Sequence, residues 1–189
     1  MRVFCRTFVT GNQTHCSMAK TLIAYYSRKG QNYVNGSIRN LKKGNTEVVA
    51  EKIQALLPEA DLFEIDTIRR YSEDYMTSTE EAKVDIRNNA RPELTAVVEN
   101  MDQYDTIILG YPIWWGLPPM AVYTFLESYD FSGKKIVPFS THEGSGLGGS
   151  VRGIKGIVPG ATVTAGTAIH GAEAAHADRE VKQIIAQAQ

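Results

Sequence analysis

The strongest constraint on the fold of this chain is a regular alternation of strand-like and helix-like segments after Thr21. Short apolar runs rich in β-branched residues occupy 22–26, 60–65, 104–110, 135–139 and 161–165. Helical patterns follow these runs, at 46–57, the second half of 72–89, 119–129, 147–157 and 172–187. Because strands that alternate with helices form parallel sheets covered on both faces, we predict an α/β fold with a five-stranded sheet.

The length, composition and net charge of the chain limit which classes of protein it can belong to. The chain has 189 residues, 43% hydrophobic and 22% charged, which suits one globular domain with a packed core. The net charge of −1 gives neither a basic footprint for nucleic acid nor an acidic surface for a basic redox partner. No apolar run approaches the roughly 20 residues that span a bilayer, and the first residues lack a signal peptide's apolar stretch. We therefore expect a cytoplasmic protein with no membrane partner.

Residues 1–17 differ in composition from the rest of the chain. They are rich in Thr, Asn, Gln and Cys without a clear period, and Met18 opens the first strand pattern. We predict that 1–17 are a peripheral N-terminal extension and that 18–189 form the ligand-binding domain. Both cysteines, Cys5 and Cys16, lie in this extension, and we expect free thiols rather than a disulfide. No paired C-x-x-C is present, so no metal site is expected.

In open α/β sheets the ligand lies beyond the carboxyl ends of the strands, where the winding reverses. The loop after the first strand begins with Ser27-Arg28-Lys29-Gly30, and Gly44-Asn45-Thr46 opens the next helix. Small residues, hydroxyl groups and the free N–H groups of a helix N-terminus are suited to phosphate binding. The alternative is an ordinary helix cap at Asn45 or Thr46. A Walker pattern is absent, which disfavours ATP or GTP. Asn35-Gly36 predicts a hairpin turn near the ligand.

The loop after the third strand carries both tryptophans of the chain, Trp114 and Trp115, side by side between a proline and a glycine. A turn exposes at least one of them, and a large exposed aromatic surface indicates a flat ligand that covers it. Packing or a dimer contact is the alternative. Prolines before and after the pair stiffen this loop and lower the entropy lost on binding.

The loop after the fourth strand, 140–149, is polar and rich in glycine. Residues 144–149 match G-x-G-x-x-G, but four polar residues separate them from the strand, so the match is weak evidence for a dinucleotide fold. We expect backbone N–H groups that reach the carbonyls and nitrogens of a ring. His142 is expected to hydrogen-bond a ring carbonyl or to be a simple loop histidine, with proton transfer the less favoured alternative. His15, His170 and His176 have no clustered partners in the sequence and are expected to be structural.

Together, Ser27-Arg28-Lys29-Gly30 with Gly44-Asn45-Thr46, the 104–116 segment ending in Pro-Ile-Trp-Trp-Gly, and 131–146 resemble the flavodoxin-like FMN-binding family. The resemblance covers about residues 20–170 and is closest to short bacterial members with that tryptophan loop. It implies a three-layer fold with strand order 2-1-3-4-5, helices on both faces, and FMN at the carboxyl edge of the sheet. By resemblance, the phosphate would contact Ser27, Arg28, Lys29, Asn45 and Thr46. The ring would lie between Pro112, Ile113, Trp114, Trp115 and Gly116 on one side and Thr141, His142, Glu143, Gly144, Ser145 and Gly146 on the other.

The chain departs from the family at the phosphate loop, which is normally continuous as Ser-x-x-Gly-Asn-Thr and is split here. Gly30-Gln31-Asn32 competes with Gly44-Asn45-Thr46 for this role, and we prefer the latter because it directly precedes the helix. Lys43 is an alternative to Lys29.

The function expected from this resemblance is an FMN-dependent oxidoreductase that passes electrons from NADH or NADPH to a quinone or similar acceptor. The near-neutral charge favours this function over a pure electron carrier, since it gives little surface potential for docking a charged protein. The alternatives are a one-electron carrier that docks on protein partners, and a binding protein that has lost its cofactor. The donor and acceptor could be small molecules or proteins, and the sequence leaves a homodimer open.

Overall fold

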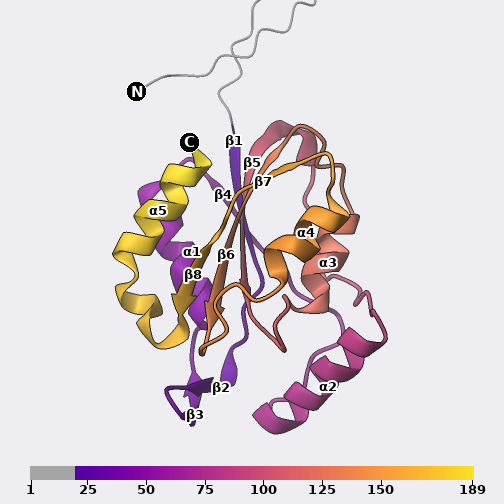
Figure 1. Cartoon of the computed structure of the whole chain (residues 1–189), viewed down its shortest axis with the longest axis vertical. Helices are drawn as coiled ribbons and strands as arrows, with labels where there is room; N and C mark the ends of the chain where they lie inside the picture. Colours follow the sequence, from indigo (N-terminus) through magenta and orange to yellow (C-terminus); the bar gives the residue numbers. More distant parts are fainter. Residues whose placement is uncertain (1–19) are drawn as a thin grey trace, which may run out of the picture.

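The structure is a computed structural model that describes residues 20–189. A parallel β-sheet forms its centre (Figure 1). The hydrogen-bonded order is β4 (Asp61–Glu64), β1 (Lys20–Tyr25), β5 (Tyr104–Pro112), β6 (Lys135–His142) and β7 (Thr162–Val163). This is the predicted order 2-1-3-4-5, and every pair in the sheet is parallel. The predicted extension 1–17, with Cys5 and Cys16, lies outside the described residues.

The last strand corrects the prediction of five strands, because it is divided in two. β7 pairs with Lys135–Ile136 of β6, and β8 (Thr167–His170) pairs with the other end of the same strand. The break lies beside Pro138, which cannot donate a ladder hydrogen bond. Gly166 takes φ +80° at this point, and a Cβ there would lie 3.2 Å from the carbonyl oxygen of Pro138. Within residues 20–189 the sheet therefore has six strands.

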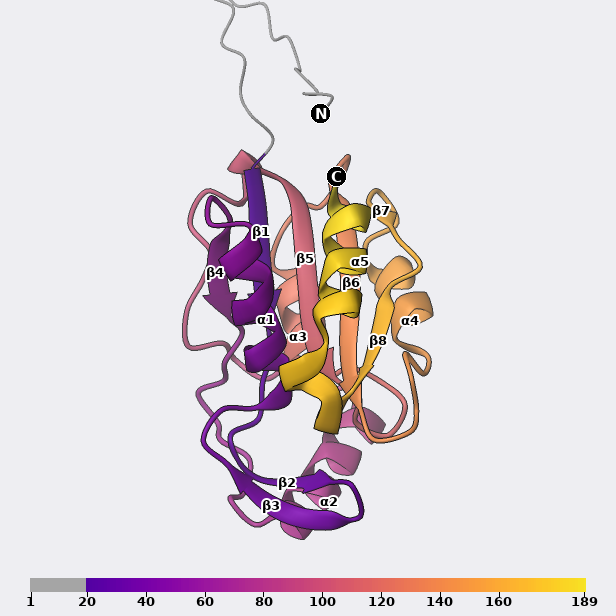
Figure 2. The ribbon, with the colours of Figure 1, turned by 90° about the vertical axis from the view of Figure 1, so that its left-hand side faces the viewer.

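Helices cover both faces of the sheet, as predicted (Figures 1 and 2). One face carries α1 (Asn45–Leu56) and α5 (Asp178–Ala188), and the other carries α3 (Met120–Glu127) and α4 (Ser150–Ile157). The helix predicted over 172–187 begins as a separate 3-10 turn, Gly171–His176. A further 3-10 turn, Met101–Gln103, precedes β5.

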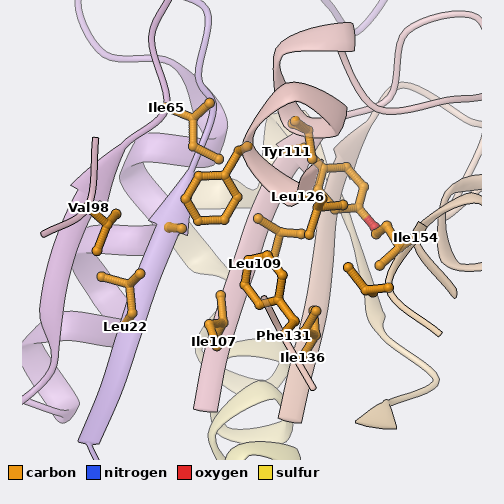
Figure 3. Close-up of a cluster of buried hydrophobic side chains, with 14 of the residues drawn as sticks. Leu22, Ile65, Val98, Ile107, Leu109, Tyr111, Leu126, Phe131, Ile136 and Ile154 are labelled. Atoms are coloured by element: carbon orange, nitrogen blue, oxygen red, sulfur yellow. The ribbon is translucent and has the colours of Figure 1, made fainter. Parts of the chain in front are cut away.

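The strands are buried on both faces, which is why their sequences are continuous apolar runs. Leu22 and Ala24 of β1 pack in one core, while Ile23 and Tyr25 of the same strand pack in the other. Figure 3 shows the first core, where Ile107, Leu109 and Tyr111 of β5 face the α3–α4 side.

Two elements extend past the carboxyl ends of the strands. The hairpin of β2 (Gly30–Val34) and β3 (Ser37–Leu41) turns at Asn35 and Gly36, which have φ +46° and +83°. Positive φ at both central residues is what a type I′ hairpin requires, so the predicted turn is confirmed. Helix α2 (Tyr75–Arg87) lies beyond the same end of the sheet on the other side (Figure 1). The hairpin and α2 thus flank the edge where β1, β5 and β6 end.

Candidate functional site

The split loop after β1 closes into one turn. A Cβ on Gly44 would lie 2.2 Å from Ser27 Oγ and 2.4 Å from the Arg28 carbonyl oxygen, so only a glycine allows this approach. The Ser27 hydroxyl accepts a hydrogen bond of 3.1 Å from the amide of Glu47, in the first turn of α1. The hairpin begins and ends at this turn, because Gly30 pairs with Leu41. The insertion therefore leaves Ser27 and Gly44 adjacent, although many residues separate them in the sequence.

The three predicted loops line one cavity at the carboxyl ends of β1, β5 and β6. We call it the first cavity. Its lining includes Arg28, Asn45, Thr46, Pro112, Ile113, Trp114, Thr141, His142 and Glu143 from the predicted set. Asn32, Tyr33, Tyr75 and Gly171 complete the lining.

Hydrogen bonds hold the loops in register around the first cavity. The hydroxyl groups of Thr46 and Thr141 lie 2.8 Å apart, and both residues are buried. The amide of Ile113 donates to the carbonyl of Thr141 at 2.9 Å. The start of α1, the end of β5 and the end of β6 are therefore connected directly.

Glu143 connects the first cavity to the hairpin. Its Oε2 accepts a hydrogen bond of 3.0 Å from the amide of Asn35 and lies 3.8 Å from His170 Nε2. Its Oε1 is shielded from solvent and has no hydrogen-bond partner within residues 20–189. A Cβ on Gly171 would lie 2.6 Å from this Oε1 and 2.6 Å from Asn45 Nδ2. The carboxylate thus keeps one buried acceptor that a ligand donor could satisfy.

His142 is held as a neutral ring at neutral pH. Burial lowers its pKa, the charge of His170 lowers it further, and Glu143 raises it by less. The His142 and His170 ring centroids lie 5.6 Å apart. His142 Nδ1 accepts a hydrogen bond of 2.9 Å from the amide of Gly144, so the neutral ring carries its proton on Nε2. His142 is therefore available as a hydrogen-bond donor.

Other predicted residues lie outside the lining of the first cavity. Lys29 faces Glu47 and Glu64, with Nζ 3.6 and 3.4 Å from their carboxylates. Lys43 pairs with Glu51. The remaining predicted residues, Ser27, Trp115, Gly116, Gly144, Ser145 and Gly146, are also absent from this lining. Two of these residues stabilise the shape of the loops through their backbone carbonyls. The Gly116 carbonyl accepts a hydrogen bond from the Gly149 amide, and the Ser145 carbonyl accepts one from the Gly148 amide.

Trp114 and Trp115 differ in their surroundings. Trp114 packs edge-on against Tyr26 and Tyr71, with centroids 5.5 and 5.2 Å away. Trp115 lies at the tip of a tight turn in which Trp114 and Leu117 exchange both backbone hydrogen bonds. It has φ +52°, and the residue is 55% exposed. Positive φ is strained for a bulky residue, so the turn and its neighbours hold Trp115 in place.

Sequence reasoning did not find Tyr75 or Gly171. Tyr75 stacks on Tyr33, with ring centroids 6.2 Å apart and an angle of 22°. Its amide donates to Gln31 Oε1 at 2.9 Å. Asn35-Gly36 predicted a hairpin close to the ligand, but nothing in the charged segment 72–89 indicated that Tyr75 would pack on that hairpin.

Among residues 20–189, no cluster of three or more histidine, cysteine, aspartate or glutamate side chains is arranged to hold a metal ion. Within the same residues, no helix is long and apolar enough to cross a membrane.

A doubly wound parallel sheet with a lined cavity at the carboxyl ends of its strands defines a ligand-binding α/β protein of the open-sheet class. A family profile described as Flavodoxin matches residues 20–186. The chain belongs to this flavodoxin family, as the resemblance of its three loops implied.

Solved structures give the same fold. A protein of Bacteroides eggerthii proposed to be a flavoprotein is 28% identical, with a TM-score of 0.68 over 89% of this chain and 94% of its own. A flavoprotein of Lactobacillus acidophilus in complex with FMN is 25% identical, with a TM-score of 0.62 over 82% of this chain and 95% of its own. No curated protein sequence matches the chain.

Proposed function

We propose that the chain binds FMN without a covalent bond and acts as an FMN-dependent oxidoreductase. One observation carries this proposal: Arg28, Asn45, Trp114 and His142, from three loops distant in sequence, line one cavity beside the start of α1. The similar Lactobacillus acidophilus flavoprotein is described in complex with FMN, which supports the choice of ligand.

The phosphate would bind at the N-terminus of α1, through Asn45, Thr46 and the hydroxyl of Ser27. Gly44 at the N-cap position brings the backbone close, and helix N-termini favour anions. Lys29 contributes less charge than the sequence suggested, because two carboxylates lie near its ammonium group.

The ring would lie between Pro112, Ile113 and Trp114 on one side and His142 and the rest of its loop on the other. One hydrogen-bond acceptor and one donor of the chain are suited to a ring that carries both N–H donors and carbonyl acceptors. Glu143 Oε1 is a buried acceptor without a partner among residues 20–189, and neutral His142 offers a donor at Nε2. The residues present therefore fit the cofactor. The other loop residues, Trp115, Gly116, Gly144, Ser145 and Gly146, are proposed to shape this wall.

Bound FMN supplies the capacity to take up and release one or two electrons. The overall reaction we propose is NAD(P)H + H⁺ + quinone → NAD(P)⁺ + hydroquinone. The chain's own residues hold the reactants, orient them and exclude water; neutral His142 provides a hydrogen bond rather than a charge. The net charge of −1 gives little surface potential for docking a charged protein, which supports small-molecule reactants.

The second candidate is a one-electron carrier, and the match to the Flavodoxin profile favours it. The two functions differ in what the purified protein does alone. An oxidoreductase oxidises NADH or NADPH when a quinone is present, whereas a carrier accepts electrons from dithionite and shows no turnover with either nicotinamide.

The experiment is a visible absorption spectrum of the full chain purified from bacteria, followed by titration with FMN and with riboflavin. We expect flavin bands and a higher affinity for FMN, because riboflavin lacks the phosphate. NADH or NADPH should then bleach the bands, and a quinone should restore them. A protein that retains no flavin bands after added FMN has been removed by gel filtration would contradict the proposal.

A further inference from the structure

A second cavity adjoins the first, between α2 and the turn that carries the two tryptophans. Its lining is Arg28, Asn32, Tyr75, Ser78, Thr79, Ala82, Ile113, Trp114 and Trp115. Arg28, Asn32, Tyr75, Ile113 and Trp114 also line the first cavity. By contrast, Asn45 and Thr46 line only the first. The residues that line only the second cavity come from α2 and from Trp115, so this cavity extends towards α2.

Aromatic side chains held in place by the protein dominate this lining. Trp114 is oriented by Tyr26 and Tyr71, as described above. Trp115 Nε1 donates to the Thr79 carbonyl of α2 at 3.1 Å, and Lys83 Nζ lies 4.1 Å from its ring centroid. These contacts hold a half-exposed indole against α2 despite the positive φ of its backbone. A preformed space with two indoles and Tyr75 in its walls favours a flat aromatic molecule.

Arg28 provides the polar group of the second cavity. Its Nε donates to the Gln31 carbonyl, and its Nη2 donates to the carbonyls of Ser72 and Glu73, just before α2. These bonds orient the guanidinium towards α2 and leave Nη1 without a partner among residues 20–189. No carboxylate of those residues forms an ion pair with Arg28 either. A half-buried cation with an unused donor suits a carbonyl oxygen.

The hydroxyl groups of Ser78 and Thr79, on the α2 side, do not compete for this role as donors. Ser78 Oγ donates to the Tyr75 carbonyl and Thr79 Oγ1 to the Met76 carbonyl, both at 2.7 Å. Asn32 Nδ2 donates to the carbonyls of Arg28 and Gly30. Arg28 Nη1 is thus the charged donor that remains for a ligand in this part of the cavity, beside the neutral Tyr75 hydroxyl and Trp114 Nε1.

We infer that the second cavity is a binding site for a planar quinone, with the ring between the aromatic walls and a carbonyl oxygen on Arg28. The inference rests on the proposed function, because it identifies the acceptor site next to the proposed cofactor. Asn45 and Thr46, at the proposed phosphate site, line only the first cavity, whereas Ser78, Thr79 and Trp115 line only the second. We therefore place the two ligands in adjacent cavities that share Trp114.

The test uses the full chain loaded with FMN and tetramethyl-1,4-benzoquinone as the probe. The ring carbons of this quinone are fully substituted, so it does not alkylate Cys5 or Cys16. The chain has two tryptophans, and their indole N–H signals in a ¹H–¹⁵N spectrum report on both walls. We expect saturable shifts of both signals in the FMN-loaded protein. If the quinone leaves both signals unmoved while FMN is bound, the inference is wrong.

A variant that fills the second cavity gives the sharper test. Thr79→Phe places a ring in this lining but not in that of the first cavity, so quinone affinity should fall about tenfold or more. FMN affinity should stay unchanged. Val84→Phe introduces the same ring on an exposed site of α2, in neither lining, and should bind the quinone like wild type. Equal quinone affinity in Thr79→Phe and wild type would overturn the inference.

A second variant covers the case in which Thr79→Phe does not fold. Trp115→Gly removes one aromatic wall and suits φ +52°, so the fold should persist while the quinone binds about tenfold more weakly. Unchanged affinity here would count against the site. The proposed function is tested separately by FMN absorbance: loss of FMN binding refutes it, whereas FMN binding without quinone shifts refutes only the second site.

Discussion

The hydroxyl oxygens of Thr46 and Thr141 lie 2.8 Å apart and join the first turn of α1 to the end of β6. Both residues are almost fully buried, and within residues 20–189 each hydroxyl has the other as its hydrogen-bond partner. This single bond links the proposed phosphate site to the loop that carries His142.

Thr46→Val or Thr141→Val should each lower the free energy of unfolding by about 1–3 kcal/mol, because the partner hydroxyl is left buried without a hydrogen bond. The double variant should lose less than the sum of the two, since it leaves no orphan hydroxyl. Urea unfolding of the FMN-free protein measures all three values. Strict additivity would show that the two hydroxyls do not interact.

Gly44→Ala should destabilise the protein by about 1–3 kcal/mol and weaken FMN binding, since its Cβ would meet the Arg28 carbonyl oxygen at 2.4 Å. The backbone of two joined segments must move to make room. Gly156→Ala is the matched control: a Cβ there meets nothing within 4 Å, and the site lies in α4. This control should gain about 0.5–1 kcal/mol from helix propensity. Thermal unfolding measures the stability of both variants. If Gly44→Ala were as stable as wild type, the prediction would be wrong.

The central strands could be predicted from sequence because both of their faces are buried. Residues 107–109 form a continuous apolar run, and the strand predicted over 104–110 covers Tyr104–Pro112 in the structure. The divided last strand could not be predicted, since Thr167–His170 alternates between buried and half-buried residues and carries no continuous apolar signal. The division depends on β6, where the pairing with β7 ends before Pro138 and the pairing with β8 begins after it.

The site was predictable where it follows from topology. Once β1, β5 and β6 are parallel, their following loops meet at one edge, so Asn45, Trp114 and His142 could be grouped in advance. Tyr75 reaches the first cavity from α2, through contacts with Gln31 and Tyr33 of the hairpin. Such tertiary packing has no signature in the local sequence.

His142 should titrate below its ordinary pKa of about 6.5, because burial and the charge of His170 both oppose its protonation. Replacing His170 with glutamine should raise the titration midpoint of His142 towards that value without reaching it, since burial is the larger cause. The midpoint is measured by following the ring proton signal by NMR. An unchanged midpoint in His170→Gln would show that the two rings are not coupled.

The same shift predicts how stability depends on pH. Above about pH 6.5, His142 is neutral in both the folded and the unfolded chain and has no effect. As the pH falls below this value, the unfolded chain takes up the proton first, so the free energy of unfolding decreases until the folded pKa is passed. His142→Asn should therefore show a shallower loss of stability in this window, measured by urea unfolding at several pH values. An equally steep loss would mean that other groups cause it.

The choice between the two Gly-containing segments of the split loop can be tested by comparing Asn45 with Asn32. Asn45 lies at the start of α1, next to Gly44 in the chain. By contrast, the side-chain nitrogen of Asn32 already donates hydrogen bonds to the carbonyls of Arg28 and Gly30. If the phosphate binds at α1, Asn45→Ala should weaken FMN binding about tenfold or more and leave riboflavin binding nearly unchanged, because only FMN carries the phosphate. Asn32→Ala removes bonds within the hairpin base, so it should affect FMN and riboflavin equally. Fluorescence titration with both flavins measures the four affinities. An FMN-specific loss in Asn32→Ala instead would place the phosphate at the base of the hairpin, because the effect of a phosphate contact must disappear when the phosphate is absent.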